Sequence, residues 1–561
     1  MARADAILAA AVVLALALKF LLAFRIDVHW DEFYFLSQVH DYLRGDLTAR
    51  LQTFHVHFFS WLPMLGTDEM GQIVAGRLAM WMCLAGSVVL IYGLARRFVS
   101  HGGALFAALA YLSVSAIADH GASFRTDSLA TFLALLSFYL MLRRPGGSLG
   151  AALAGVAMAV AMLVTIKSVF HLAALAAALL WLTPGIRDRA RLAAAFAGVF
   201  GLVFAAGYLW HASALAEPEA GAATGFLGRT ASKMLFEDGL LPRWKELLTV
   251  VILNPLFWLM TLMGAGTAWG WTRGKGGRDS RDGWLVLALA LPLLTPLLYR
   301  NAFLYFYVFI LPAASLLVGI TFDKYLRRDA IDREAKRLPV AFLLLFAQCA
   351  FFCAIYALRL PDRTEAERVT IAGIHAVFPE PVPYIGGYGI AATLPRVGFF
   401  MSGWGLDSYR REGHPVFADL VAKTQPPLLL ADSPALTAAL IPGWDIDKKY
   451  ALLPADIDYL RENYLPYWGM IFVAGKRLQI PAASDSVAFD IAVSGDYRLG
   501  SARPAVIDGQ MREPGDVVRL AAGHHVLSGS VPGEAVLRWA PALPPPDTAP
   551  VDFMTFFDIR E

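Results

Sequence analysis

Apolar residues dominate the first two thirds of this chain, in runs long enough to cross a membrane. The first run, residues 7–24, reads ILAAAVVLALALKFLLAF, and similar runs recur to about residue 358. A transmembrane helix needs about 20 predominantly apolar residues. We therefore predict eleven spans, near residues 7–24, 73–94, 103–120, 128–142, 149–166, 168–183, 192–212, 247–270, 284–299, 303–321 and 338–358. Spans four to six are short, so tilted, broken or re-entrant segments remain alternatives there.

After Arg359 the pattern changes to that of a water-soluble region. Residues 365–378 and 416–423 have helical periodicity, whereas PLLLADS (427–433) and MIFVAGK (470–476) have the pattern of buried strands with turn exits. We therefore expect a small α/β layer over residues 361–480.

The last residues, 481–561, have a purely β pattern. VAFDIAV (487–493) alternates apolar and polar residues, and Asp508-Gly509 lies between two short apolar segments, which is a strong hairpin signal. A small β-sandwich is the predicted result. It resembles sugar-associated sandwich modules in the residues Ile507, Asp508, Gly509, Leu520, Gly523, His525 and Leu527. A packing module without a ligand is the alternative.

Basic residues are concentrated in alternate connections between the predicted spans. They include Arg96-Arg97, Arg143-Arg144 and the cluster within residues 324–337. Lys and Arg are enriched in cytoplasmic loops, which places the opposite connections, and residues 359–561, on the outer side. One outer loop holds the segment 225–236, which has the pattern of an interfacial amphipathic helix.

Composition agrees with a polytopic membrane protein. Hydrophobic residue types make up 57% of the chain and charged types 17%, whereas soluble domains carry about 25% charged residues. The net charge of +2 gives no reason to expect a nucleic-acid partner. The three cysteines all lie in apolar runs, so neither a disulfide framework nor a zinc-type spacing is expected.

The first outer loop carries an acidic pair, Asp31-Glu32, directly after His29-Trp30 and before Phe33-Tyr34. Carboxylates near hydrocarbon are costly to desolvate and mark functional sites. A carboxylate in such a setting suits a general base. Capping of the helix that follows is the alternative, and it would account for one of the two acids.

At this point the chain resembles the GT-C glycosyltransferases, and within them the branch of lipid A aminoarabinose transferases and protein O-mannosyltransferases. The acidic pair is the first shared feature. The others are the R-x-D motif Arg125-Thr126-Asp127 before the fourth span, Lys167 near the outer end of the fifth, and the approach to a late span with Arg300, Tyr305 and Pro312. The resemblance covers about residues 1–320.

The chain also departs from this pattern. Family members often have two prolines where this chain reads Phe54-His55-Val56-His57, and Lys167 is followed by Ser168 instead of glycine. On a strand, His55 and His57 would face the same way. They would then bind metal or phosphate, or remain interfacial polar residues.

The resemblance implies transfer of a sugar from a polyprenyl phosphate. Lys167 and Arg300 would hold the phosphate, and Asp31 would accept the proton of the acceptor, with Glu32 orienting the acceptor or assisting as base. Arg125 would pair with Asp127 or with Asp31. Asp127 is then either a second active-site acid or a structural partner. Tyr34 and Tyr305 complete the substrate-binding candidates.

The sequence thus predicts an inverting glycosyltransferase of a bacterial cytoplasmic membrane, with its first span retained and its acceptor (lipid, glycan or protein) on the outer face. No cofactor is required by the pattern, and a divalent metal remains open. The alternatives are a transporter or flippase with a glycan-binding extracytoplasmic domain, or a scaffold protein. The expected fold is an α-helical polytopic membrane domain over residues 1–360, with the α/β layer at 361–480 and the β module at 481–561.

Overall fold

The computed structural model describes residues 2–143, 147–183, 185–216, 239–275, 279–326, 338–480 and 486–557. The chain forms two compact units. We call Met1–Ile26, Tyr42–Leu62 and Val74–Asp362 the helical unit, and Asp27–Asp41, Pro63–Ile73 and Arg363–Glu561 the C-terminal unit. Most of the loop with the acidic pair therefore packs with the C-terminal unit.

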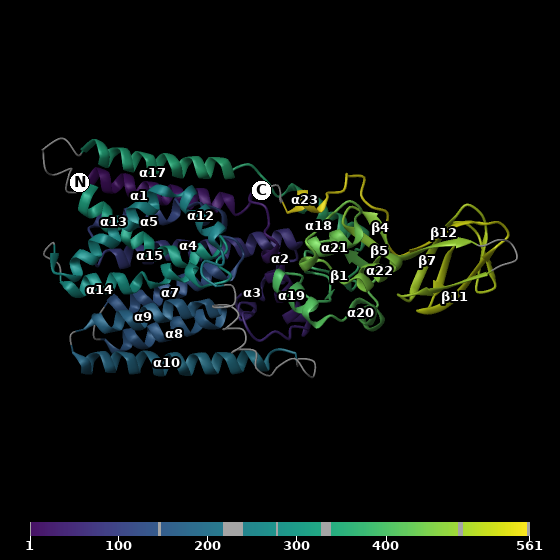
Figure 1. The fold of residues 1–561 in the computed structure, drawn as a ribbon, viewed down its shortest axis with the longest axis horizontal. Coiled ribbons are helices and arrows are strands. Elements are labelled where there is room, and N and C mark those ends of the chain that lie inside the picture. The colour runs from purple at the N-terminus through teal and green to yellow at the C-terminus, as the bar shows by residue number, and fades with distance from the viewer. Residues whose placement is uncertain are drawn as a thin grey trace. The chain divides into compact units, whose positions relative to one another are not determined.

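The helical unit is a bundle of apolar helices whose long members lie side by side (Figure 1). The helices that begin in it or run into it are α1 (Ala2–Leu22), α2 (Trp30–Arg44), α3 (Val56–Phe59), α4 (Glu69–Ala95), α5 (His101–Leu112), α6 (Ser115–His120), α7 (Thr126–Arg143), α8 (Ser148–Val164), α9 (Val169–Leu182), α10 (Ile186–Ser213), α12 (Trp244–Leu253), α13 (Pro255–Thr272), α14 (Ser280–Leu289), α15 (Phe306–Thr321) and α17 (Leu338–Arg359). α15 is buried along its whole length, so it lies at the centre of this unit.

A helix or a pair of helices occupies each of the eleven predicted span positions. Among the described residues, five helices are long and apolar enough by themselves to cross a membrane, and the pair α12–α13 makes a sixth if it counts as one span. The expected number of eleven therefore stays a prediction. The predicted interfacial helix at 225–236 lies outside the described residues.

The breaks in the helices at the predicted span positions fall mainly at spans three, eight and nine, and not at spans four to six. The third span consists of α5 and α6, the ninth of α14 and a 3₁₀ segment (Leu291–Leu297), and the axes of α12 and α13 differ by 96°. Asn254 joins two of these breaks. Its side-chain amide donates to Ser115 Oγ at 2.9 Å, and its Oδ1 accepts from the Ser115 amide at 3.0 Å. Pro255, which lacks an amide proton, begins the helix that follows.

The C-terminal unit contains an α/β layer within residues 363–480. It contains α18 (Glu365–Val377), α19 (Gly403–Glu412), α20 (Phe417–Thr424), α21 (Pro434–Leu440), α22 (Pro454–Asn463), β1 (Tyr384–Gly386), β2 (Arg396–Val397), β3 (Leu428–Leu430), β4 (Tyr464–Trp468) and β5 (Ile471–Ile480). β1 is parallel to both β2 and β3, and β3 is antiparallel to β5. The parallel pairs bring the carboxyl ends of β1 and β3 to one edge of the sheet.

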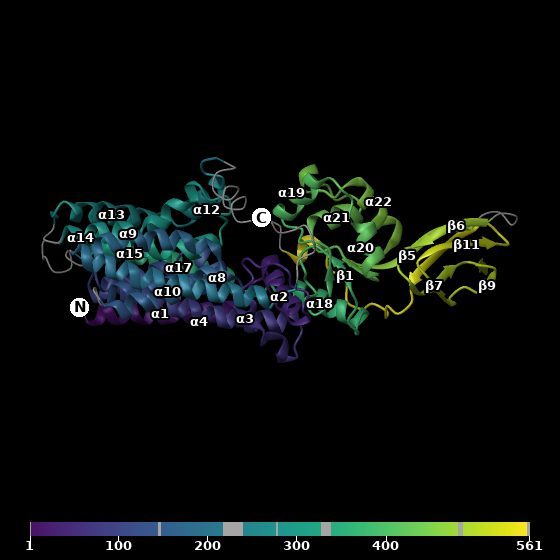
Figure 2. The same ribbon diagram turned by 90° about the horizontal axis from the view of Figure 1, so that it is seen from below.

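The β-rich region follows, and β5 connects the two parts (Figure 2). Its first half pairs with β3, and its second half pairs with β12 (Gly533–Trp539). β12 continues to β7 (Gly495–Ser501) and β10 (Val517–Leu520). A separate sheet has the order β6 (Ser486–Ile491), β11 (Gly523–Gly529), β8 (Ala505–Ile507) and β9 (Gln510–Arg512).

Side chains from both sheets form one core, which includes Phe489, Tyr497, Leu499, Leu527 and Leu537. The predicted hairpin is confirmed: Asp508 and Gly509 both have positive φ, 49° and 79°, between β8 and β9. Positive φ at both central residues is typical of the tight turn that matches the twist of a hairpin.

Candidate functional site

A buried ion cluster lies at the start of α7 in the helical unit. Lys167 Nζ lies 2.7 Å from Oδ1 of Asp127, and Arg125 Nε lies 3.3 Å from Oδ2 of the same carboxylate. The three side chains are 10%, 4% and 3% exposed for Lys167, Arg125 and Asp127. Two cations share one carboxylate, so the three side chains together carry a net charge of +1 in a mostly apolar bundle.

Local structure places the members of this cluster. Asp127 is in the first turn of α7, where the helix dipole favours a negative charge. Lys167 is in the short 3₁₀ turn Ile166–Ser168 that separates α8 from α9. Ser168 Oγ donates to the Ala161 carbonyl at 2.9 Å, which fixes that turn. Ser168, at the position where the resemblance leads us to expect glycine, thus has a structural contact.

Tyr305 covers the two cations. The Arg125 guanidinium carbon lies 3.5 Å from the centroid of the Tyr305 ring, and Lys167 Nζ lies 5.2 Å from it. Both distances are within the range of cation–π attraction. Arg300 lies in the turn before α15, where its backbone carbonyl accepts from Arg243 Nε at 3.0 Å. Four residues from three separate sequence motifs therefore meet: Arg125, Asp127, Lys167 and Tyr305.

The histidines of the first outer loop differ from the expectation. His55 and His57 lie at the start of the helical turn α3, so the strand arrangement that would point them the same way is wrong. His55 is buried, and His57 is partly exposed. The apolar residues Phe54, Val56 and Phe59 are buried around them, and this packing favours the helical turn over an extended strand.

His57 instead belongs to a hydrogen-bonded chain that the sequence did not reveal. Its Nε2 lies 2.8 Å from Nδ1 of His211, and His211 Nε2 lies 2.9 Å from Thr53 Oγ1. Thr53 donates its hydroxyl proton to the Ala49 carbonyl at 2.6 Å. Because the Thr53 hydroxyl donates to Ala49, its oxygen accepts a proton from His211 Nε2. Nδ1 of His211 is then an acceptor for the Nε2 proton of His57. Neutral His57 therefore carries its proton on Nε2 and presents Nδ1 as an acceptor. Burial lowers the pKa of His57, which keeps this form at neutral pH.

The acidic pair lies in the C-terminal unit, at the start of α2. Glu32 Oε1 accepts from the His29 amide at 3.2 Å, and His29 precedes the first helical residue. This is the reciprocal contact of a capping box. His29 Nδ1 accepts from the Asp31 amide at 3.2 Å and lies 3.8 Å from Asp31 Oδ2. The capping alternative thus accounts for Glu32, while Asp31 has the histidine beside it.

Aromatic rings surround this pair. Trp30 stacks on Tyr388 with ring centroids 5.0 Å apart, and Tyr34 stacks on Phe400 at 3.6 Å. Arg396 lies 6.0 Å from the Tyr34 ring. Burial raises the pKa of the Tyr34 hydroxyl, although Arg396 opposes this. Tyr388, Arg396 and Phe400 were not predicted, because they lie more than 350 residues away in a region that we interpreted as a separate layer.

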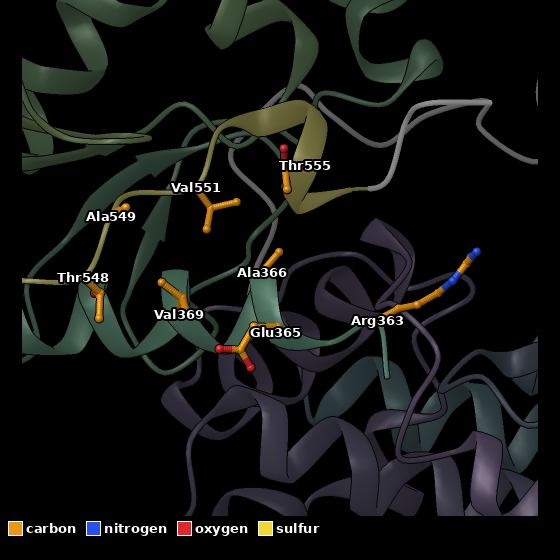
Figure 3. Close-up of a pocket in the computed structure, with 8 residues that line it drawn as sticks. All are labelled: Arg363, Glu365, Ala366, Val369, Thr548, Ala549, Val551 and Thr555. Atoms are coloured by element: carbon orange, nitrogen blue, oxygen red, sulfur yellow. The ribbon is translucent and has the colours of Figure 1, made fainter. Parts of the chain in front are cut away.

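The C-terminal unit also has a cavity of about 610 Å³, which the acidic pair does not line. It is lined by residues of α18 and of the segment 548–555, with Val369 and Val551 on opposite sides (Figure 3). None of the candidate residues lines it. In the described parts of the chain, no group of three or more His, Cys, Asp or Glu residues is arranged to hold a metal ion.

Comparisons with known proteins place the fold. A family model described as dolichyl-phosphate-mannose-protein mannosyltransferase matches residues 55–211. The apo oligosaccharyltransferase of Archaeoglobus fulgidus aligns with a TM-score of 0.60 at 10% identity, covering 93% of this chain and 94% of its own. ArnT of Cupriavidus metallidurans, solved with undecaprenyl phosphate, aligns with a TM-score of 0.53 at 17% identity, covering 78% of this chain and 95% of its own.

A further structure, AglB of A. fulgidus in complex with an inhibitory peptide and a dolichol-phosphate, aligns with a TM-score of 0.54 at 12% identity, covering 92% of this chain and 76% of its own. No curated protein sequence gave a significant match. These likenesses give the chain the fold of the GT-C glycosyltransferases, and the family-model match over residues 55–211 supports the resemblance to the mannosyltransferases.

Proposed function

We propose that this multi-pass membrane protein with the GT-C fold is an inverting glycosyltransferase. It takes a sugar from a polyprenyl-phosphate donor and transfers it to a hydroxyl or amine of an envelope acceptor on the outer face of a bacterial cytoplasmic membrane. The observation that carries this proposal is the buried cluster of Arg125, Asp127, Lys167 and Tyr305. Two cations held by one acid suit an anionic lipid headgroup.

The cationic cluster would stabilise the leaving group. As the bond between the sugar C1 and the phosphate oxygen breaks, negative charge develops on the polyprenyl phosphate. Arg125 offers planar paired donors and Lys167 a compact point charge, both in a water-poor setting where electrostatic attraction is strong. Asp127 is accordingly a positioning residue in this proposal. An acid already paired with two cations is a weak proton acceptor.

Asp31 is the proposed general base. Its carboxylate accepts the proton of the acceptor, the acceptor atom forms the new bond to C1, and the polyprenyl phosphate leaves from the opposite face with its electron pair. Glu32 acts through the helix cap, which keeps the first turn of α2 and its neighbour Asp31 in place.

The predicted topology supports an outer-face reaction. The connections that hold Asp31, Asp127 and Lys167 are poor in Lys and Arg relative to the alternate set, which is the expectation for the extracytoplasmic side. Two structures with the same fold were solved with a bound polyprenyl phosphate, undecaprenyl phosphate for ArnT and dolichol-phosphate for AglB. A donor of that chemical class is therefore the natural first choice.

The test is a transfer assay with the purified full-length chain. Polyprenyl-phosphate mannose and a panel of other polyprenyl-phosphate sugars are supplied with total envelope lipid, glycan and protein fractions as acceptors. We expect transfer from at least one donor, lost in Asp31→Asn. The matched control is Asp27→Asn, because Asp27 is in the same loop but pairs with Arg363, at 3.8 Å, near the surface. Transfer at the wild-type rate by Asp31→Asn would refute the mechanism.

A further inference from the structure

Asp432 is a fully buried carboxylate that gathers backbone amides of one loop in the C-terminal unit. Its Oδ1 accepts from the Gly387 amide at 2.5 Å, and its Oδ2 accepts from the amides of Tyr388 at 3.2 Å, Gly389 at 3.1 Å and Ile390 at 3.5 Å. Four successive amides thus point at one side chain. Burial raises the pKa of Asp432, and the amides oppose that shift by stabilising its charged form.

The sheet explains why these residues meet. β1 ends at Gly386 and β3 ends at Leu430, and the two strands are parallel neighbours, so their carboxyl ends lie together. The loop 387–390 leaves β1 there, and Asp432 leaves β3 two residues after its end. The Met401 amide also donates to the Gly387 carbonyl, at 3.1 Å. The loop is therefore held from two sides by a rigid edge.

The same loop packs closely against α2, the helix that carries Asp31. The Tyr388 ring stacks on Trp30, the residue before Asp31. Gly389 has φ +78°, and a Cβ placed on it would lie 3.1 Å from Ser37 Oγ and 3.2 Å from Ser37 Cβ. A side chain there would be both strained and crowded. This close approach lets the loop support α2 over two of its turns, at Trp30 and at Ser37.

We propose that Asp432 is a positioning residue for the reaction. Through the loop 387–390 and the Tyr388 ring it fixes Trp30, and with it the direction of the Asp31 carboxylate. This inference rests on the proposed function. It gives the C-terminal unit a part in the chemical step, beyond any role in binding glycan, and it makes a residue 401 positions from Asp31 in sequence necessary for the turnover rate.

The test compares Asp432→Asn with Asp456→Asn in the full-length chain. Asp456 is a matched control because it is also buried in the same unit and also accepts backbone amides, those of Val416 and Phe417, at 2.9 to 3.1 Å, but it does not contact the loop. An asparagine at 432 places an NH₂ group among amide donors that need an acceptor. We measure kcat and KM for the donor, and hydrogen–deuterium exchange of residues 28–40 and 384–392.

For Asp432→Asn we expect kcat to fall at least about tenfold with KM for the donor nearly unchanged, because the interaction acts on the reacting geometry. Amide exchange should rise in the loop and also in the first turns of α2, whereas Asp456→Asn should leave both regions and kcat near wild type. Exchange that rises in the loop alone, or equal losses of kcat in both variants, would overturn the proposal.

Failure of the proposed function is distinguishable from failure of this inference. If the wild-type chain transfers no sugar, the transferase proposal fails, while the exchange measurement still reports whether Asp432 controls the order of α2. If the wild type transfers sugar and Asp432→Asn does so at the wild-type rate, the positioning role alone is refuted.

Discussion

Lys167 and Asp127 form a direct ion pair, with 2.7 Å between Nζ and Oδ1, although 40 residues separate them. A lysine near the end of a membrane span usually extends its amine toward water. Lys167 instead turns its amine to a buried carboxylate that it shares with Arg125. The cost of burying these charges is offset only because they lie together, which points to a functional cluster.

Replacing Lys167 by methionine should weaken binding of undecaprenyl phosphate. Methionine keeps the apolar stem and removes the charge, so we expect about a 10- to 100-fold rise in Kd. Binding is measured by displacement of a labelled lipid from the detergent-solubilised protein. Lys324→Met is the control, because Lys324 also belongs to the helical unit but is exposed and contacts Thr267, with Nζ 3.3 Å from Oγ1. Equal affinities of Lys167→Met and wild type would contradict the assignment.

Tyr305 should act through its ring and not through its hydroxyl. Loss of a desolvated cation–π contact costs about 1–2 kcal/mol, which corresponds to roughly a 5- to 30-fold loss in lipid affinity for Tyr305→Leu. Tyr305→Phe should stay within about twofold of wild type. Tyr325→Leu serves as the control, since Tyr325 also lies under a lysine, with 4.7 Å between Lys324 Nζ and the ring centroid. A strong defect in Tyr305→Phe would show that the hydroxyl matters instead.

The two acids of the pair should respond differently to amide substitution. Glutamine can replace glutamate in a capping box, so Glu32→Gln should keep most of the activity. Asp31→Asn removes the proposed base and should lower kcat by about 100-fold or more. Glu32→Ala removes the cap and should lower stability by about 1 kcal/mol, seen as a lower thermal midpoint. Inactive Glu32→Gln with an unchanged midpoint would assign the base to Glu32.

Local stability of the β module should depend on pH through His525 and Asp508, whose Nδ1 and Oδ2 lie 2.6 Å apart. Although partial burial opposes protonation, hydrogen bonds to the Ala521 carbonyl and to Asp508 raise the pKa of His525. Its contribution is full below the unfolded value of about 6.5 and is lost as pH rises through the raised pKa. Burial likewise works against the charged form of Asp508, but its bonds to His525 and Val526 lower its pKa.

The contribution of Asp508 is therefore present above its unfolded value of about 3.9 and is lost as pH falls through the lowered pKa. Protection of the β11 amides from exchange should be greatest between about pH 4 and 6.5. The effect should stay below about 1 kcal/mol, because Asp508 is nearly half exposed. His525→Gln should flatten the profile on its alkaline side. A profile that is unchanged in this variant would exclude the pair as its cause.

Sequence periodicity identified the helices because each apolar run is a local property. Every predicted span position holds a helix or a helix pair, and the hairpin at Asp508-Gly509 follows from a backbone preference of two residues. The motifs around Arg125 and Lys167 were visible for the same reason. The sequence left open whether Arg125 pairs with Asp127 or Asp31, and the structure shows the pair with Asp127.

Other features depend on contacts between residues that are far apart in the chain. The His57–His211 contact spans 154 residues, and His211 lies at the end of an apolar run where no local pattern marks it. Residues 56–59 form a helical turn in which Val56 and Phe59 are buried, so the strand on which His55 and His57 would face the same way does not form.

By itself, the sequence determined where this chain is apolar, where it turns and which residues bear charge, since these are written in short stretches of neighbouring residues. Only the tertiary structure decided that residues 27–41 fold with the C-terminal unit, and that Asp432 holds the loop beside Trp30. Those outcomes depend on which segments pack together. Burial and hydrogen bonding between distant segments, which no local pattern encodes, select among the partners that each side chain could take.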